Sequence, residues 1–409
     1  MSQNVTLEVL KELVEGDAVA IRGRAVLDPG GGPGDKVFPP SHSVDKGANK
    51  PGAKYAFESR RRNGCDVLCV LLDSVQSQAN RMEEALQSLW SERQLALPVI
   101  AVDLSEVAPD IGTITSLTAP HRVADALLRD SLLGDNLFRY SPIGHSFTDA
   151  TIRNAGPLFK VCPTGLIFGI WDSTGPRGGL GAKFARTLTS EIVGIGVEPG
   201  VKTKSRIDPA SIVTKAAEIY EAKDANERWT HEPKLAKQKT GAPVKIGDGR
   251  VSEVNHSNVP PTIDTLAGGV TIDYAEHIVV LSLAALRRIG FSDGGPEARL
   301  VLAALGLVAV LASESRGHDL RSRCLLIPRK GEALALEAVA RDGSTLRLEI
   351  DLDAALVLYG DAVKALPPSL EFDKPAGEPI ATLTPSPKLA YLIERSRELA
   401  AAGSAIGEE

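Results

Sequence analysis

Aromatic residues are scarce in this sequence of 409 residues: 3 Trp, 6 Tyr and 9 Phe make up 4% of the chain. This scarcity argues against a nucleic-acid site built on rows of stacked rings, because each stacked base needs an aromatic partner. An excess of basic charge is also missing, since 52 acidic residues outnumber 46 basic ones and the net charge is -6. The composition therefore excludes a protein that coats nucleic acid with its whole surface, and any such site must be a local patch.

Cysteine is rare as well. The four thiols are Cys65, Cys69, Cys162 and Cys324, and no second Cys or His pair accompanies the first two, as a structural zinc site would need. We therefore expect free thiols in a reducing cytosol. The longest apolar run, residues 300–312, is shorter than the roughly 20 residues that cross a bilayer and predicts a buried helix. The N-terminal residues lack the apolar core of a signal peptide, so we expect a cytoplasmic protein without a membrane partner.

The spacing of apolar residues predicts helices and strands in mixed order with antiparallel hairpins, and hence the α+β fold class. The expected helices cover residues 5–15, 73–90, 121–133 (capped by Thr118), 209–222, 274–290 and 297–313. The expected strands cover residues 18–27, 66–72, 97–104, 165–172, 187–199 and 324–328, followed by a hairpin with its turn at Asp342-Gly343. We expect a single domain over residues 1–409, with a Gly/Pro-rich loop insertion at 28–54 and a mobile, charged insertion at 223–262.

Positive charge is concentrated in one window. Residues 153–250 hold 16 Lys or Arg against 10 Asp or Glu, a balance of +6, so the remainder of the chain sums to -12. The basic residues gather in three segments that are predicted loops: Arg177, Lys183 and Arg186 among glycines; Lys202, Lys204 and Arg206; and Lys234, Lys237 and Lys239. A single cluster of exposed cations is most simply a solvated surface, but three clusters around a Gly-rich turn favour a polyanion partner.

The Gly-rich segment, residues 173–186, matches neither common phosphate motif. A Walker A loop needs glycine at the sixth position from Gly175, where Leu180 stands, and the dinucleotide fingerprint needs glycine where Phe184 stands. What remains is a backbone that an extended polyanion can approach closely, flanked by cations that suit phosphate oxygens. A tight strand-to-strand connection without any ligand explains the same residues.

A second polar segment lies where a predicted strand runs into a predicted helix. It contains Ser74, Gln76, Ser77, Asn80 and Arg81. Hydrogen-bonding groups and a guanidinium at a helix N-terminus favour anions. Simple capping by Asp73 or Ser74 is the alternative, although it leaves the other residues unexplained.

No catalytic or metal-binding pattern stands out. His145 lies near Ser141, Ser146 and Asp149, but catalytic triads assemble from separated segments and a G-x-S-x-G elbow is absent. The other histidines occur singly, without H-x-x-x-H spacing, at His42, His121, His231, His256, His277 and His318. We therefore expect no enzyme, no cofactor and no metal site.

Five strings resemble a known family. They are GDKVFPP (34–40), VLLDSVQSQANRMEEAL (70–86), ATIRNAGPLF (150–159), LIFGIWDSTGPRGGLGAKFARTLTSEIVG (166–194) and GVKTKSRIDP (200–209). In these strings the chain resembles the backbone subunit of the type I-G (formerly I-U) CRISPR Cascade, a Cas-seven type subunit of the RAMP superfamily also called Csb-one. The strings are long and unusual, and they lie in the first 210 residues.

The resemblance implies an RRM-like (ferredoxin-like) palm with inserted finger and thumb elements, for which segments 28–54 and 223–262 are both thumb candidates. It further implies a non-catalytic, crRNA-binding subunit of antiviral defence. Copies of this subunit form a homo-oligomeric filament along the spacer and present bases to a target DNA strand. The implied partners are the crRNA, the target DNA, other copies of the subunit, the large subunit and the RNA-end-capping subunit of Cascade, and indirectly a recruited helicase-nuclease. Backbone binding agrees with the charge map, because cations hold phosphates while base pairing reads sequence.

Carried onto this sequence, the resemblance gives a set of candidate RNA-binding residues. They are Lys36, Ser74, Gln76, Ser77, Asn80, Arg81, Arg153, Trp171, Asp172, Ser173, Arg177, Lys183, Arg186, Lys202, Lys204 and Arg206. Trp171 suits stacking on a base, but a large aromatic at a strand end is as often part of a core. The alternative function is that of an RNA-cleaving relative that uses a loop aspartate, for which Asp172 and Asp149 are the candidates.

Overall fold

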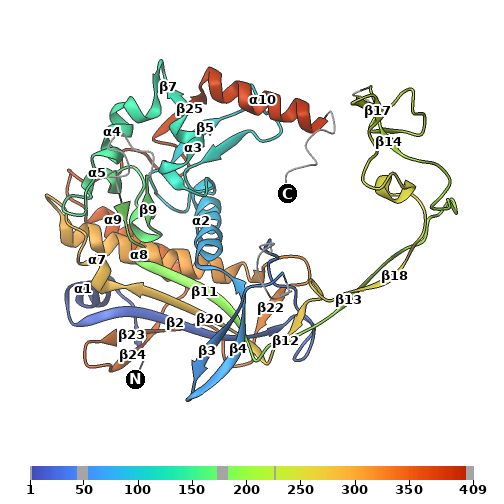
Figure 1. Ribbon diagram of the computed structural model, residues 1–409. Coiled ribbons are helices and arrows are strands. Elements are labelled where there is room, and N and C mark those ends of the chain that lie inside the picture. Colours follow the sequence, from blue (N-terminus) through green and yellow to red (C-terminus); the bar gives the residue numbers. More distant parts are fainter. Residues whose placement is uncertain (1, 44–53, 173–182, 225–226, 402–409) are drawn as a thin grey trace. The chain divides into compact units, whose positions relative to one another are not determined.

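The computed structural model describes residues 2–43, 54–172, 183–224 and 227–401 (Figure 1). It confirms the α+β fold class, with a large sheet and ten α-helices in the described ranges. The chain divides into two compact units, which are treated separately below. Unit 1 comprises Met1–His42, Tyr55–Glu198 and Val270–Leu389, and unit 2 comprises Ser43–Lys54, Pro199–Gly269 and Ala390–Glu409.

Unit 1 is organised around a ten-stranded sheet. Its path runs β1 (Ser2–Asn4), β24 (Thr345–Glu349), β23 (Ala335–Ala340), β2 (Ala18–Pro29), β20 (Tyr274–Ser282), β11 (Leu188–Ile195), β4 (Cys65–Asp73), β3 (Phe57–Arg62), with β22 (Leu325–Pro328) on β2 and β21 (His318–Asp319) on β22. All neighbours pair antiparallel except β1 and β24. The predicted strands 18–27, 66–72 and 324–328 and the hairpin at Asp342-Gly343 lie in this sheet, and the predicted strand 187–199 is β11 in this sheet followed by the separate β12 (Glu198–Pro199).

The four central strands follow the order β23-β2-β20-β11. Because β2 and β11 are both antiparallel to β20 between them, they point the same way, and β23 points the same way as β20. Helix α2 lies in the connection from β2 to β11, and α8 lies in the connection from β20 to β23. The hairpin β3–β4 is inserted before α2 and extends the sheet at the far edge of β11.

The helices begin and end where local chemistry allows. Their bounds are α1 Leu7–Glu15, α2 Val75–Ser91, α3 Ala126–Arg129, α4 Pro142–Thr148, α5 Gly156–Phe159, α6 Thr164–Ile167, α7 Leu283–Leu286, α8 Gly295–Ser315, α9 Leu352–Lys364 and α10 Pro387–Ala401, with 3-10 helices η1 Arg122–Ala124, η2 Phe138–Tyr140 and η3 Val251–Val254. Thr6 caps α1 by accepting the Val9 N–H, and α1 ends at Gly16. Asp351 caps α9 in the same way through the Ala354 N–H. The predicted helices 5–15, 73–90 and 297–313 correspond to α1, α2 and α8.

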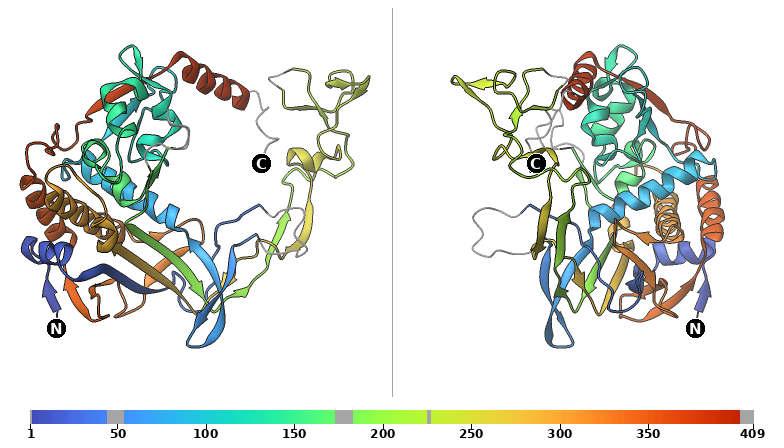
Figure 2. Two further views of the ribbon diagram at one scale, coloured as in Figure 1. Left: turned by 60° about the vertical axis from the view of Figure 1, so that its left-hand side comes forward. Right: turned by 90° about the vertical axis from the view of Figure 1, so that its right-hand side faces the viewer.

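Helix α8 forms the centre of the core. It packs on α1, α2, α9 and β20, and the views agree that these helices cover one face of the large sheet (Figures 1 and 2). Gly306 faces β20, since a Cβ there would lie 3.4 Å from the Leu281 side chain, at ordinary van der Waals contact. By length and composition alone α8 is long and apolar enough to cross a membrane, but most of it is buried inside the protein, as in the core helix of a soluble fold.

The opposite face of the sheet is lined by ion pairs. Side chains alternate along β2, so Ile21 and Ala25 face the helices while Arg22 and Arg24 face away. The pairs on this second face are Arg22 with Glu337, Arg24 and Arg62 with Glu276, Arg60 with Glu58 and Glu191, and Arg329 with Asp28. Five arginines thus meet five carboxylates, and the paired groups sum to no net charge.

Smaller sheets complete unit 1. A five-stranded sheet has the order β6 (Thr113–Thr115), β5 (Ile100–Asp103), β25 (Ala381–Pro385), β7 (Ser131–Leu133), β8 (Asn136–Leu137). Two-stranded ribbons pair β9 (Ile170–Trp171) with β10 (Lys183–Phe184) and β12 (Glu198–Pro199) with β19 (Val270–Thr271). The four cysteines are free, and all but Cys65 are buried, which agrees with the expected thiols.

The described residues 199–269 of unit 2 form a two-stranded ribbon with a small head. The ribbon pairs β13 (Lys202–Arg206) with β18 (Val259–Asp264), and the head contains β14 (Tyr220–Glu221), β15 (Trp229–Thr230), β16 (Gln238–Lys239), β17 (Ala242–Pro243) and η3. Ile219, Val251 and Val254 form the buried apolar cluster of the head. The described part of the predicted insertion 223–262 lies within this segment.

Two predicted helices are wrong. Residues 274–290 form β20 and then the short α7, because Ile278, Val279 and Val280 are β-branched and β20 pairs on both edges, with β2 and β11. Residues 209–222 contain no helix. Asp208 accepts backbone N–H groups from the turn that follows it, and Ser211 has a positive φ of 57°, which breaks a helix.

Two further predictions fail in part. The expected helix 121–133 is split into η1, α3 and β7, because Arg122 has a positive φ of 57° and Asp125 starts a new helix by accepting the Leu127 N–H. Thr118 accepts the Thr115 N–H instead of capping a helix. The expected strand 165–172 is α6 followed by β9, with Gly169 at a φ of 81° between them.

Candidate nucleic-acid interface

The first candidate surface is the N-terminus of α2. Ser74 is the N-cap, and its hydroxyl accepts the Ser77 N–H at 3.2 Å. Capping therefore explains Ser74. Gln76 is exposed, while Ser77 and Asn80 are half-buried. Gln76, Ser77 and Asn80 thus place polar, uncharged side chains beside the partly positive end of the helix dipole.

Arg81, also expected here, is held inside unit 1. Its Nε donates to Oδ2 of Asp73 at 3.0 Å, and its Nη2 donates to the carbonyl of Leu320 at 2.6 Å. The Asp73 carboxylate is fully buried and also accepts from Arg321 at 3.3 Å and from Gln78 at 2.6 Å. Arg81 therefore joins α2 to β4 and to the loop before β22, and its guanidinium already has two partners.

The second candidate surface is the ribbon β9–β10, which flanks the Gly-rich segment. Trp171 is 58% exposed, so it is not part of the core. Lys183 pairs with Trp171 across the ribbon, and its ammonium lies 5.1 Å from the centre of the indole ring. Arg186 follows and is exposed. Ser173 and Arg177, which were predicted to bind RNA here, lie outside the described residues.

Asp172 does not share this exposure. It is buried, and Nη2 of Arg139 lies 3.0 and 2.9 Å from its two carboxylate oxygens. The carboxylate next to the exposed tryptophan is therefore engaged by a cation from η2. Arg139 is a residue that the sequence did not single out, because it lies 33 positions away from its partner.

A buried ion pair connects the two candidate surfaces within unit 1. Arg122 of η1 contacts both carboxylate oxygens of Glu83 in α2, at 2.6 and 2.7 Å, and donates to the carbonyl of Gly169 just before β9 at 3.1 Å. Burial raises the pKa of Glu83 to about 7, and the charge of Arg122 opposes that rise. The pair fixes the start of the β9–β10 ribbon against α2, and both views draw the two elements close together (Figures 1 and 2).

Two more predicted residues lie elsewhere in unit 1. Arg153 is exposed in a turn closed by hydrogen bonds to Gly290, and it makes no hydrogen bond or ion pair within the described ranges. A Cβ at Gly290 would lie 2.4 Å from the Arg153 carbonyl oxygen, so this close approach depends on glycine. Lys36 is half-buried in the coil after β2, beside the buried Val37.

The last three predicted residues belong to the ribbon of unit 2. Lys204 lies 2.7 Å from Oδ2 of Asp264 and Lys202 lies 3.7 Å from the same oxygen. The hydrogen bond from Lys204, with help from backbone N–H groups, lowers the pKa of Asp264 to about 2. Arg206 donates to the carbonyl of Ser257 at 2.6 and 3.1 Å. The three cations are therefore brought together, but one carboxylate offsets part of their charge.

The structure thus defines an α+β protein whose exposed, unpaired cations in unit 1 include Lys183, Arg186 and Arg153 within the described ranges. Residues 21–199 match the model of the family described as CRISPR-associated protein GSU0053. The match covers somewhat less than half of the chain and contains α2, the ribbon β9–β10 and four of the five strings that carry the resemblance. Over these residues the chain is similar to CRISPR-associated proteins, which implies a role in CRISPR defence. No curated protein matches the chain.

Proposed function

We propose that this protein is the guide-RNA-binding backbone subunit of a type I-G CRISPR Cascade. Copies of it polymerise along the spacer of the crRNA in the cytoplasm and present bases for pairing with target DNA. The observation that carries the proposal is the family match over residues 21–199, which includes both candidate surfaces of unit 1. Its partners would be the crRNA, the target DNA strand, further copies of itself, and the large and RNA-end-capping subunits, with a helicase-nuclease recruited later.

The topology of unit 1 supports an RRM-like palm. The strand order β23-β2-β20-β11, with α2 and α8 as the two crossovers on one face, corresponds to the β-α-β-β-α-β arrangement of ferredoxin-like folds. The hairpin β3–β4 would be an insertion into this palm. The ribbon β13–β18 with its head supports a finger or thumb built from residues 199–269, which include the predicted insertion 223–262.

The chemistry of the exposed residues suits a backbone contact. Lys183 and Arg186 supply charge for phosphate oxygens, and the exposed Gln76 and the half-buried Ser77 supply neutral hydrogen bonds near a helix N-terminus. The second face of the sheet is a poorer site for a polyanion, because five of its arginines are already matched by five carboxylates. Sequence would be read by base pairing and not by these side chains.

The proposal includes a non-catalytic role. A loop aspartate that cuts RNA must be free to bind a metal or position a nucleophile, whereas Asp172 is buried against Arg139. We expect the purified protein with its guide to leave complementary target RNA intact over a prolonged incubation with Mg²⁺. Cleavage by the wild type that is lost in Asp172→Ala would instead favour the RNA-cleaving alternative.

Co-purification with guides of two lengths tests the main proposal. The chain would be co-expressed with a CRISPR array that carries spacers of two lengths, purified without nuclease treatment, and weighed by native mass spectrometry. We expect complexes that contain RNA of defined length and more copies of the subunit on the longer spacer. A monomer free of RNA, or a copy number independent of spacer length, would contradict the proposal.

A further inference from the structure

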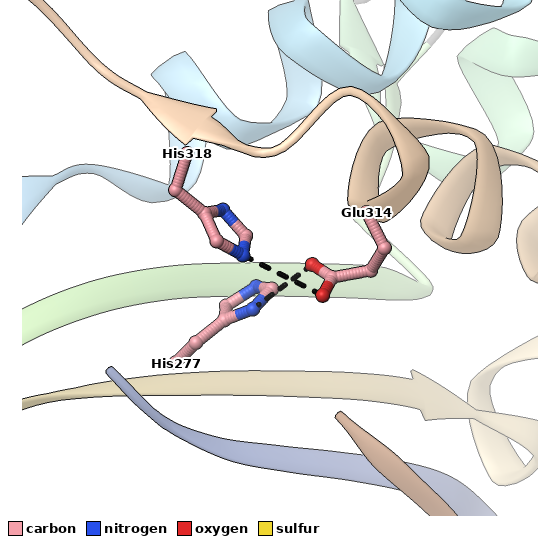
Figure 3. Close-up of side chains that lie close together, drawn as sticks. All are labelled: His277, Glu314 and His318. Atoms are coloured by element: carbon pink, nitrogen blue, oxygen red, sulfur yellow. Dashed lines mark ion pairs between the residues drawn. The ribbon is translucent and has the colours of Figure 1, made fainter. Parts of the chain in front are cut away.

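Two residues from one short segment, Glu314 and His318, meet the distant His277 between the large sheet and the helices that cover it. His277 lies on β20, on the face covered by helices, Glu314 lies in the last turn of α8, and His318 begins β21 (Figure 3). Gly317, with a φ of 72°, ends the helical path and turns the chain so that His318 lies beside Glu314. The cluster could not be predicted from the sequence, because only Glu314 and His318 are close in the chain and His277 is distant from both.

The cluster is compact and largely buried. Nδ1 of His277 lies 3.2 Å from one carboxylate oxygen of Glu314, and Nε2 of His318 lies 3.5 Å from the other. The three ligand atoms all lie within 4.8 Å of one another. The side chains of His277, Glu314 and His318 are 1%, 18% and 6% exposed. Figure 3 shows both rings directed at the carboxylate.

A hydrogen-bond chain fixes the tautomer of His277. Asp73 can only accept as a carboxylate, so the Gln78 amide directs its NH₂ at Asp73, at 2.6 Å, and its oxygen at Ser190, at 2.9 Å. The hydroxyl of Ser190 donates its one proton to that amide oxygen. It must therefore accept from Nε2 of His277, which lies 2.8 Å away.

With Nε2 protonated, Nδ1 of neutral His277 presents a lone pair to the Glu314 carboxylate. This nitrogen is buried and has no hydrogen-bond partner in the described part of the chain. A lone pair held against an anion is repulsive unless a second proton or a metal cation lies between them. A hydrogen-bonded outer partner such as Ser190 is what orients a metal-binding imidazole.

We propose that His277 Nδ1, the Glu314 carboxylate and His318 Nε2 bind one divalent transition-metal ion of the zinc class. Two ligands about 2.0–2.1 Å from a tetrahedral ion lie roughly 3.3 Å apart, a spacing close to the two nitrogen–oxygen distances of this cluster. Imidazole nitrogens select zinc-class ions over magnesium or calcium. Three protein ligands leave one position for water. The ion would tie the end of α8 and the start of β21 to the central strand β20.

Metal titration of the tag-free chain tests the site. Protein stripped with a chelator would be titrated with Zn²⁺ by calorimetry, and with Co²⁺ while the visible absorption of the cobalt is recorded. We expect saturable binding of one ion per chain and a higher Tm with Zn²⁺ than without it, because the ion binds only the folded site. His318→Gln should weaken binding by more than roughly a hundredfold, since loss of an outer partner alone costs 10–100-fold.

His121→Gln is the matched control, because His121 is exposed and lies outside the cluster; it should bind both metals as the wild type does. Ser190→Ala provides a second variant should His318→Gln fail to fold. It leaves all three ligands in place and should weaken Zn²⁺ binding about 10–100-fold. If the stripped wild type binds no stoichiometric Zn²⁺, or if both cluster variants bind it as tightly as the control, a second proton on His277 accounts for the cluster and the metal site is wrong.

Discussion

At the scale of the residue, Asp73 has the most consequential environment in the candidate interface. Its carboxylate is fully buried at the end of β4 and holds two guanidiniums, those of Arg81 and Arg321. Asp66, at the other end of the same strand, pairs with Arg61, and both side chains are exposed to solvent. The two aspartates therefore allow a matched comparison of a buried and an exposed ion pair in one strand.

Asp73→Ala should lower the free energy of unfolding by about 3 kcal/mol. This lies at the low end for a broken buried pair, because both guanidiniums keep partial access to water. Asp66→Ala should cost less than about 1 kcal/mol, since exposed pairs contribute little. Guanidinium unfolding followed by circular dichroism measures both values. Equal losses in the two variants would show that Asp73 does not hold this corner of the sheet together.

The sequence could predict that the candidate positions are polar, but not whether each side chain faces solvent or is paired inside the fold. Ser74 as a cap and Lys183 as an exposed cation follow from local patterns, and the structure agrees with both. Arg81 and Asp172 were expected at the interface, yet each is paired inside the fold. The Leu320 carbonyl that Arg81 contacts is 239 positions away, and the Arg139 that pairs with Asp172 is 33 positions away, so no local spacing predicts either contact. The cluster of His277, Glu314 and His318 was not predicted for the same reason, because His277 is distant in the sequence from the other two.

At the scale of the element, the ribbon β13–β18 of unit 2 depends on one carboxylate. Asp264 closes the ribbon opposite Lys202, and its pKa is lowered to about 2 chiefly by the hydrogen bond from Lys204. A carboxyl group with a depressed folded pKa stabilises the fold above its ordinary pKa of 3.8 and loses that contribution as the pH falls through about 2. The ribbon should therefore be held at neutral pH and weakened in acid.

Lys204→Met should raise the pKa of Asp264 most of the way to its ordinary value. In the wild type, the side-chain carbon resonance of Asp264 should scarcely move between pH 6 and pH 3, whereas in the variant it should titrate within that range. Carbon-13 NMR of the full chain measures this, with Asp264→Asn to assign the resonance. Lys239→Met, in the head of the same unit, is the control and should titrate as the wild type does. Identical curves for Lys204→Met and the wild type would mean that another group depresses this pKa.

Helices whose apolar residues follow the helical period could be predicted from the sequence. A strand whose buried residues happen to follow the same period could not. Helices α1, α2 and α8 have caps or uniform apolar faces, and the predicted segments fall on them. In β20 and α7 the buried Ala275, Val279, Leu283 and Leu286 repeat every three or four residues, which imitates a helix. Residues 274–282 form a strand because β20 pairs with β2 on one edge and β11 on the other, and these contacts with distant segments cannot be read from the local sequence.

At the scale of the whole molecule, the division of charge sharpens the choice of interface. The chain is acidic overall, and many of its basic residues are neutralised by partners inside the same unit. Strand order in a large sheet depends on contacts between distant segments, so the sequence could suggest the palm only through its resemblance to a family. The placement of Lys183 beside the exposed Trp171 was likewise visible only in the fold.

Salt dependence of guide binding separates this interface from general surface charge. In protein freed of co-purified RNA, Lys183→Ala combined with Arg186→Ala should flatten the slope of log affinity against log salt by up to about 1.4, since each phosphate contact on a single strand contributes about 0.7. Fluorescence anisotropy with guides of three different spacer sequences measures the slope, and the loss should be uniform among them because phosphates carry no sequence information. Lys11→Ala combined with Lys330→Ala removes the same charge from exposed positions outside the candidate surfaces and should leave the slope close to that of the wild type. Equal flattening in both double variants would assign the binding to diffuse charge, and a loss confined to one spacer would assign it to base contacts.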